Sequence, residues 1–220
     1  MKSTSPLASS PMPTDSVRTE VGIIDSVDGA AVTSESLPDR KERILSAAAD
    51  LVASKGYHAV SVADIGAAAG VTGPAIYRHF RGKPAVLTAL FDRAIDQLVA
   101  EAHSIAGRDD DVAAALSSMV DGQVRFVVED RVLAQVYYTE INSLPDDDRR
   151  RLRRKQRLYL EEWVHLLSEV RPDLDELEVR STVHAAIGAI QSALFHRVDL
   201  PEARLRLALA RAAHNVLRSP

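Results

Sequence analysis

A short run of side chains around residue 78 has the types and the spacing to bind a nucleic acid. Tyr77, Arg78 and His79 are consecutive, and Lys83 follows four positions later. Arginine, lysine and tyrosine side chains are common hydrogen-bond donors to phosphate oxygens, and histidine adds a further polar contact. Such side chains hold a duplex only when helices present them on one surface. The elements that position them therefore decide whether they can act together.

Positive charge is concentrated around this run. The chain of 220 residues has 27 basic and 31 acidic side chains, and its net charge of −4 by itself disfavours a nucleic-acid-binding protein. Residues 40–83, however, contain seven basic and three acidic side chains, whereas residues 84–220 are net negative. Residues 1–39 are also net negative, carry scattered Pro, Ser and Thr, and have no helical period. We predict that they form a disordered acidic arm without a role in DNA binding.

Two short helices are predicted directly before the run. Between residues 40 and 55 apolar residues recur at three- and four-residue spacing, which is typical of a helix with one buried face. Gly56 is expected to end this helix, because glycine adopts positive φ without steric cost. Ser61 is the expected N-cap of the second helix, and Gly70 is its expected end.

A third helix is predicted to carry the run itself. Thr72 is its expected N-cap, and Pro74, just inside the helix, has a backbone φ already suited to a first turn. The second and third helices meet across the Gly70–Val71 turn. This spacing is that of a helix-turn-helix, in which the second helix enters the major groove of DNA.

The residues of these three helices resemble the DNA-binding signature of the TetR family. The resemblance spans residues 40–87 and is carried by the runs Lys55 to Tyr57, Ser61 to Ile65 and Ala69 to Phe80, followed by Lys83 and Leu87. Around residues 72–80 the chain looks like lipid- or acyl-CoA-responsive members of the family from actinobacteria. It departs from the family in having Gly66 where alanine is usual, and in having few polar side chains at the front of the third helix. Methyl contacts and DNA shape are therefore expected to contribute a larger share of the recognition of the DNA sequence than direct hydrogen bonds to bases.

The resemblance implies a role for each matched position. Ser61 is expected to contact a phosphate, and Arg78 either a phosphate or a base. The remaining expected contacts are Thr72, Gly73, Pro74 and Ala75 to bases, and Tyr77, His79 and Lys83 to the DNA backbone. A homodimer would place two recognition helices on an inverted-repeat operator, about one helical turn apart.

Helical patterns continue to the end of the chain. They predict helices from about 83 to 105, 112 to 130, 132 to 142, 146 to 170, 175 to 196 and 201 to 217, with Pro201 at the first helical position of the last one. We therefore expect an all-α fold of about nine helices. A helix-turn-helix domain at 40–84 would precede a helical ligand-binding and dimerisation domain at 85–220.

The helix at about 146–170 carries one polar residue in an otherwise apolar stripe. Gln156 lies among Leu152, Tyr159, Trp163, Leu166 and Val170. It either satisfies a hydrogen bond in the core or orients a ligand in an apolar cavity, and the pattern fits both. Most arginines of this helix fall on other faces and are expected to be solvated. From the resemblance, a small apolar molecule such as a lipid or acyl-CoA is expected in a cavity lined by Phe126, Tyr137, Tyr138, Gln156, Tyr159, Trp163, His184 and Phe195.

Small residues form one face of the penultimate helix. Ala185, Gly188, Ala189 and Ser192 recur at helical spacing and would allow another helix to approach closely. In the TetR family the last two helices form the dimer interface, so a homodimer through this face is expected. The same face would also suit the core of a monomer.

The sequence lacks the patterns of catalysis and metal binding. It has no cysteine, and His103, His165, His184 and His196 are not spaced as metal ligands. No nucleophile elbow, phosphate-binding loop or dinucleotide-binding motif is present, so neither enzyme activity nor a cofactor is expected. The chain has no apolar run of the roughly 20 residues that span a membrane and no signal-peptide pattern, which indicates a cytoplasmic protein. Alternatives to a ligand-released repressor are a regulator that activates and an all-α small-molecule carrier.

Overall fold

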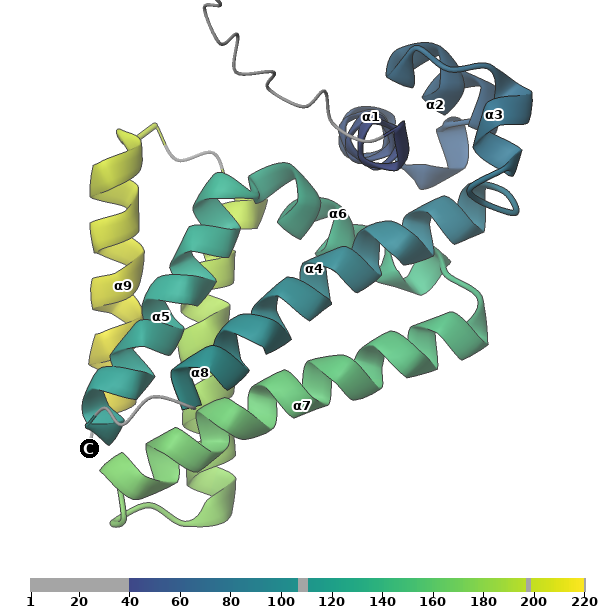
Figure 1. Cartoon of the computed structure of the whole chain (residues 1–220). Helices are drawn as coiled ribbons and strands as arrows, with labels where there is room; N and C mark the ends of the chain where they lie inside the picture. The colour runs from purple at the N-terminus through teal and green to yellow at the C-terminus, as the bar shows by residue number, and fades with distance from the viewer. Residues whose placement is uncertain (1–39, 107–110, 197–198, 220) are drawn as a thin grey trace, which may run out of the picture. The chain divides into compact units, whose positions relative to one another are not determined.

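The computed structural model describes residues 40–106, 111–196 and 199–219, all within one compact unit. The predicted acidic arm at 1–39 and most of the predicted break at 107–111 lie outside the described residues. The described part contains nine α-helices, two short 3₁₀-helices and no strand, which confirms the expected all-α fold (Figure 1). The helices are α1 (Arg40–Lys55), η1 (Tyr57–Ala59), α2 (Val62–Ala69), α3 (Gly73–Tyr77), α4 (Lys83–Ala106), α5 (Val112–Glu129), α6 (Arg131–Glu140), η2 (Ile141–Ser143), α7 (Asp146–Val170), α8 (Glu176–Phe195) and α9 (Glu202–Arg218).

Local signals set the ends of the first two helices as predicted. Gly56 has φ 78° and Gly70 has φ 65°, backbone conformations that residues with a Cβ rarely adopt. At the start of α2 the Ser61 hydroxyl accepts a hydrogen bond from Asp64 N at 3.1 Å, and the Asp64 carboxylate accepts one from Ser61 N at 2.8 Å. This reciprocal pair satisfies two of the amide donors that a helix start leaves free.

Two predicted helix starts differ in detail. Thr72 occupies the N-cap position of α3 as predicted, although its side chain makes no capping hydrogen bond. Pro201 lies at the N-cap of α9 and not at the first helical position, because α9 begins one residue later than predicted. At α8, Asp175 and Glu178 form a second reciprocal cap with both hydrogen bonds at 2.8 Å.

The helix-turn-helix is held by a small apolar core. Ile44, Ile65 and Ile76, one from each of α1, α2 and α3, are essentially fully buried. Gly66 explains how closely α2 approaches the turn, since a Cβ at this position would lie 3.0 Å from Val71 O and 3.3 Å from Ile76 Cδ1. Gly66, where the TetR signature usually has alanine, therefore lies at a point where α2 and the turn pack closely together.

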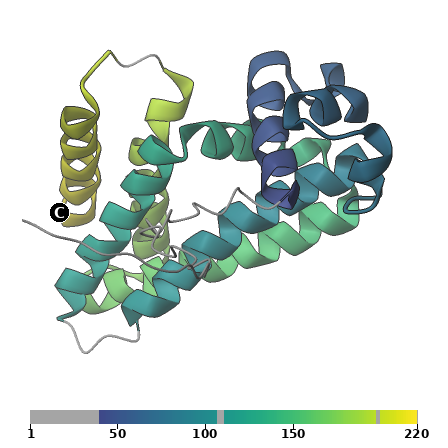
Figure 2. The ribbon, with the colours of Figure 1, turned by 45° about the horizontal axis from the view of Figure 1, so that its top comes forward.

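The long helix α4 leads from this module into the rest of the chain. It packs along α7, and the two helices run side by side in Figures 1 and 2. α1 contacts both α4 and α6, while α5 lies against α7 and α9, and α8 packs along α9. A shift between α4 and α7 would therefore move the start of α4, from which the helix-turn-helix extends.

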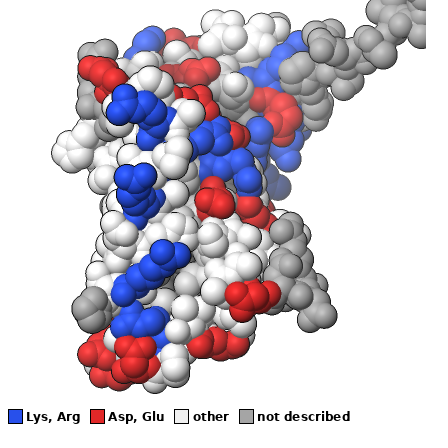
Figure 3. Space-filling view, turned by 90° about the vertical axis from the view of Figure 1, so that its left-hand side faces the viewer, with Lys and Arg blue, Asp and Glu red and all other residues white. Residues whose placement is uncertain are grey.

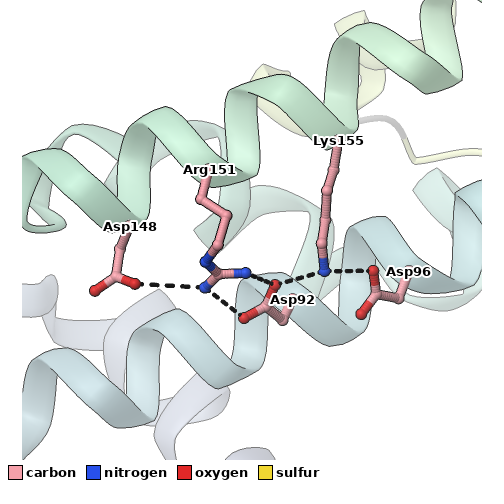
Figure 4. A network of polar contacts seen from close by, with 5 residues as sticks. All are labelled: Asp92, Asp96, Asp148, Arg151 and Lys155. Carbon is pink, nitrogen blue, oxygen red and sulfur yellow. Dashed lines mark hydrogen bonds and ion pairs between the residues drawn. The ribbon is translucent and has the colours of Figure 1, made fainter.

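A polar network joins α4 to α7 on their outer side (Figure 4). Arg151 of α7 donates two hydrogen bonds to Asp92 of α4, at 2.5 and 2.7 Å. Lys155 bonds Asp92 at 2.8 Å and Asp96 at 2.6 Å, and Asp148 is 3.4 Å from Arg151. The prediction of a solvated arginine run holds for exposed residues such as Arg150, Arg153, Arg154 and Arg157, but Arg151 is a bidentate link between two helices.

Candidate nucleic-acid interface and ligand pocket

The short helix α3 presents the predicted DNA-contacting side chains on the surface. Tyr77 is 60% exposed although its neighbour Ile76 is fully buried, and Arg78 and His79 are exposed as well. At the front of the helix Thr72 and Pro74 are exposed, whereas Gly73 and Ala75 are half-buried; Ser61 is exposed at the start of α2. α2 and α3 pack on each other, so the structure brings these residues onto one module.

Lys83 differs from the other candidates because it has partners within the protein. Its ammonium group donates a hydrogen bond to Tyr57 O at 2.8 Å and lies 4.2 Å from the centre of the Tyr57 ring. The backbone N of Tyr57 in turn donates to Glu140 of α6 at 3.3 Å. Lys83 therefore ties the start of α4 to η1, in addition to any contact it makes with DNA. The sequence alone did not suggest Tyr57 as its partner.

A narrow cavity lies among α4, α5, α6, α7 and α8. Its empty volume is about 360 Å³, but only about 20 Å³ is open to the centre of a water molecule, room for roughly one water. The lining residues are Ala94, Ile95, Leu98, Gln123, Phe126, Tyr137, Tyr138, Gln156, Tyr159, Leu160, Ile187 and Gln191. Ligand pockets usually offer about 300–1,000 Å³, so a ligand larger than a few atoms requires these helices to separate.

The structure brings five of the eight predicted ligand-contacting residues to this cavity, namely Phe126, Tyr137, Tyr138, Gln156 and Tyr159. The other three predictions do not fit. His184 is exposed and Phe195 is 57% exposed, because both lie on the outer face of α8. Trp163 is fully buried but packs behind the cavity, with its ring centre 6.3 Å from that of Tyr159.

Gln123 and Gln191 are polar lining residues that sequence reasoning missed, and Gln123 is the more deeply buried of the two. It is 1% exposed and accepts a hydrogen bond from the Tyr159 hydroxyl at 2.9 Å. The helical period of the sequence could have found Gln123, since it lies three and four positions after Val120 and Met119 on the buried face of α5.

Gln156, the polar residue predicted from the sequence, also lines the cavity but is half-buried. Val170, predicted on the same stripe, is exposed at the end of α7, and Leu167 is buried instead.

The phenol groups of the cavity are held in their neutral form. Burial raises the pKa of Tyr137 to about 12, and it also raises the pKa of Tyr138 and of Tyr159. The reason is that an ionised phenolate loses its hydration in a low-dielectric interior. Tyr138 additionally receives a hydrogen bond from Gln191 of α8.

A second, open cleft of about 610 Å³ separates α1 from the corner between α5 and α6. Side chains of both charges line it, and an ion pair between Glu42 of α1 and Arg93 of α4 spans part of it. The cleft leaves space for α1 to move relative to the corner at residues 129–133.

The outer face of α8 and α9 exposes the predicted small-residue surface. Ala185, Gly188 and Ser192 are exposed and Ala189 is half-buried. Large apolar side chains are also exposed on these two helices, with Leu177 at 74%, Leu207 at 62% and Phe195 at 57%.

On the α9 side of the molecule a column of basic side chains crosses uncharged surface (Figure 3). Exposed arginines of α9 recur every seven residues at Arg204, Arg211 and Arg218, and none pairs with a described acidic residue.

Among the residues that the structure describes, no group of three metal-ligating side chains is found. Nor is any helix in the described ranges long and apolar enough to cross a membrane.

The fold and the exposed α3 face define a helix-turn-helix protein with an all-α C-terminal domain. Two family models match the chain. "Bacterial regulatory proteins, tetR family" matches residues 44–90, and "Tetracyclin repressor-like, C-terminal domain" matches residues 109–194. The chain belongs to the TetR family, as its resemblance had implied.

Curated relatives and solved structures agree with this assignment. The chain is 29% identical over 92 residues to the HTH-type transcriptional activator FasR of Mycolicibacterium smegmatis, covering 42% of each chain. It is 26% identical over 110 residues to the HTH-type transcriptional repressor KstR2 of Rhodococcus jostii, covering 50% of this chain and 54% of KstR2. The matches thus span about half the length of these relatives. A solved structure with the same fold is FadR of Bacillus subtilis in complex with stearoyl-CoA, with a TM-score of 0.66 at 20% identity over 81% of this chain and 98% of FadR.

Proposed function

We propose that the protein is a transcriptional repressor that binds an inverted-repeat DNA operator as a homodimer and is released by a small-molecule ligand. The observation that carries this proposal is the surface at the end of α3, where Tyr77, Arg78 and His79 are exposed directly after a fully buried Ile76. A small-molecule carrier would not need this basic, helix-turn-helix surface, and the cavity is too narrow for a ligand of more than a few atoms in the form described. Both features favour a DNA-binding regulator over a carrier.

In the proposed complex, α3 lies in the major groove. Thr72, Gly73, Pro74 and Ala75 would face the bases, and Tyr77 and His79 would contact phosphates, as would Ser61 through the start of α2. Arg78 would contact a phosphate or a base. Lys83 has two further ammonium hydrogens beyond the one bonded to Tyr57 O, so it can serve both partners.

We assign the helix-turn-helix domain to residues 40–84 and the ligand-binding and dimerisation domain to residues 85–220. α4 crosses this boundary, with Lys83 at its start and Ala94, Ile95 and Leu98 in the wall of the cavity. Gln156 and Tyr159 of α7 form the opposite wall. A ligand that expands the cavity would push α4 away from α7 and tilt the DNA-binding module, with the open cleft beside α1 giving it room.

Ligand binding releases DNA only if the ligand prefers the expanded form. Because the described form has room for about one water in the cavity, it is the form that we assign to DNA binding. Expansion must also strain the Asp92–Arg151 contact between α4 and α7. The cavity and the DNA-binding surface would thus be coupled through one helix pair.

A second copy of the chain would cover the outer face of α8 and α9. Exposed Leu177, Phe195 and Leu207 supply apolar area, and Ala185 and Gly188 allow close helix approach. A two-fold symmetric contact through this face would fix the spacing of the two α3 helices.

The ligand class that we propose is a lipid or an acyl-CoA. FadR of Bacillus subtilis binds stearoyl-CoA, and the apolar lining of the present cavity suits an acyl chain. One matched relative is a repressor and the other an activator. Repression is proposed here because a ligand that widens this narrow cavity would tilt the DNA-binding module. The protein would work in the cytoplasm, without a catalytic step.

The test is a fluorescence-anisotropy titration of the protein against the intergenic DNA upstream of its own gene. We expect tight, salt-dependent binding that Tyr77→Ala and Arg78→Ala each weaken, because both remove exposed groups of the α3 surface. Arg154→Ala is the matched control, since it removes an exposed arginine of α7. Binding no tighter than to random DNA, by a protein that is still folded and dimeric, would favour the carrier. Equal loss in the control would show that general charge, and not α3, holds the DNA.

A further inference from the structure

The cavity contains two buried polar atoms without a hydrogen-bond partner. Gln123 is 1% exposed and Tyr137 is 4% exposed, and both line the cavity. Gln123 Nε2 and the Tyr137 hydroxyl have no partner among the described residues, although Gln123 Oε1 is bonded to Tyr159. A buried polar group left unpaired costs more free energy than a formed hydrogen bond gains. Two such groups in one cavity are hydrogen-bonding positions that a water molecule can fill and that a ligand oxygen can take over from it.

The same cavity is lined by uncharged side chains. Among the described residues that line it there is no Lys, Arg, His, Asp or Glu. The three phenols stay neutral, because burial raises the pKa of Tyr137, Tyr138 and Tyr159. A carboxylate or phosphate would therefore enter without a countercharge and would lose its hydration. The free amide N–H and the phenol can instead donate hydrogen bonds to a neutral oxygen.

We propose that the cavity takes a neutral, mainly apolar ligand that presents one carbonyl or hydroxyl oxygen to Gln123 Nε2 and the Tyr137 hydroxyl. This inference rests on the proposed function only in treating the cavity as the effector site. It narrows the ligand class, because a free fatty acid or the charged part of an acyl-CoA is rejected from the cavity itself. The apolar body of the ligand lies against Ile95, Leu98 and Phe126.

Trp163 provides a direct readout of binding. It is the only tryptophan of the chain, is fully buried, and packs edge-on against Tyr159 of the cavity wall. Separation of the helices around the cavity changes the surroundings of its indole ring. Intrinsic fluorescence of the full-length protein therefore reports occupancy without DNA and without a labelled ligand.

The experiment compares methyl laurate, dodecane and laurate, which share an apolar chain but differ in oxygen and charge. We expect methyl laurate to bind roughly tenfold more tightly than dodecane, the gain from one or two neutral hydrogen bonds. Laurate should bind more weakly than methyl laurate. Laurate binding as tightly as the ester, or no binding of the ester up to its solubility limit, overturns the proposal.

Two variants test the assigned atoms. Tyr137→Phe removes only a hydroxyl that has no partner, so the preference for methyl laurate over dodecane should fall to about threefold or less. The melting temperature of the free protein should stay equal or rise, whereas loss of a structural hydrogen bond would lower it. Gln123→Leu combined with Tyr159→Phe removes the amide without leaving the Tyr159 hydroxyl unpaired, and should reduce the same preference.

Tyr57→Phe is the matched control, because it removes a phenol from η1, outside the cavity. An unchanged preference in Tyr137→Phe, or an equal loss in Tyr57→Phe, overturns the assignment. The fluorescence titration contains no DNA, so its result is separate from that of the operator titration. A preference for the ester without operator binding would contradict the proposed regulator but support the ligand inference. Operator binding without a preference for the ester would support the regulator and contradict the ligand inference.

Discussion

Ile76 and Tyr77 are adjacent in the chain, yet one is fully buried and the other is 60% exposed. Their difference follows from the helical period of α3, which turns Ile76 toward α1 and α2 and Tyr77 toward solvent. Burial of Ile76 thus fixes where Tyr77 and Arg78 point. We expect each charged or hydrogen-bonding side chain on this surface to contribute to DNA affinity through its own contact. The loss of affinity on a single substitution should therefore measure that one contact.

We predict that Arg78→Ala weakens operator binding and also makes it less sensitive to salt. If Arg78 contacts a phosphate, the slope of log K against log salt concentration should become shallower by about 0.9, the value for one released counterion. Anisotropy titrations at several salt concentrations measure this slope. A weaker complex with an unchanged slope would instead assign Arg78 to a base.

Gly70 should be required for its backbone conformation alone. It has φ 65°, and a Cβ there would meet nothing within 4 Å, so Gly70→Ala introduces strain without a clash. The expected loss of stability is about 1 kcal/mol, measured by chemical denaturation. Gly73→Ala is the matched control, because Gly73 also has free space but begins a helix at negative φ. Equal effects of the two substitutions would contradict the conformational explanation.

At the scale of elements, the α4–α7 pair connects the cavity to the helix-turn-helix. Its inner side forms cavity walls, and its outer side carries the network of Asp92, Arg151 and Lys155. Burial raises the pKa of Asp92, but hydrogen bonds from Arg151 and Lys155 lower it by more, so the carboxyl pKa lies below its ordinary value. The network therefore stabilises the closed arrangement while Asp92 is ionised.

We predict that Asp92→Asn lowers the stability of the protein by about 1 kcal/mol, as expected for a partly exposed, salt-screened pair. Because the Asp92 pKa is depressed in the folded state, its contribution is present above the unfolded pKa near 4 and is lost as the pH falls through the folded value. The difference between wild type and variant should thus shrink below about pH 4. Urea denaturation at neutral and acidic pH measures it.

The same substitution should make the cavity easier to open. We expect Asp92→Asn to bind methyl laurate more tightly and the operator more weakly than wild type, since both changes favour separation of α4 from α7. Asp147→Asn is the control, because Asp147 pairs with Arg150 of the same helix and is 94% exposed. Weaker ester binding by Asp92→Asn would contradict the coupling proposed for this helix pair.

At the scale of the whole molecule, positive charge and exposed apolar surface lie on different parts of the chain. Residues 40–83, which form the helix-turn-helix, are net positive, whereas residues 84–220 are net negative, and the α8–α9 face exposes small and apolar residues. Operator binding requires two α3 helices at a fixed distance, which one chain cannot supply. If the α8–α9 face forms the proposed dimer interface, it bears on DNA affinity even though it is remote from α3 in the sequence.

We predict that Gly188→Arg dissociates the dimer and weakens operator binding together. Gly188 is exposed, and a Cβ there meets nothing within its own protomer, so the fold of the single chain should tolerate the change. Sedimentation velocity measures the oligomeric state, and circular dichroism verifies that the helices remain. Ala100→Arg on the exposed side of α4 is the control. A Gly188→Arg protein that stays dimeric would move the interface away from this face.

The sequence by itself determined the helices, the helix-turn-helix and the family. These features depend on short-range interactions: the cap at Ser61, the positive φ at Gly56 and Gly70, and the period of apolar residues all act within a few positions of the chain. Five of the eight cavity residues expected from the family resemblance also line the cavity of the structure.

Only the tertiary structure decided which side chains meet across helices. The Tyr159–Gln123 bond joins residues 36 positions apart, and the Asp92–Arg151 pair joins residues 59 positions apart. His184 and Phe195 were wrongly predicted to line the cavity because helical period defines the faces of α8 but not which face meets the core. That choice depends on how the helices pack, since burial of one face is a property of its neighbours and not of the helix alone.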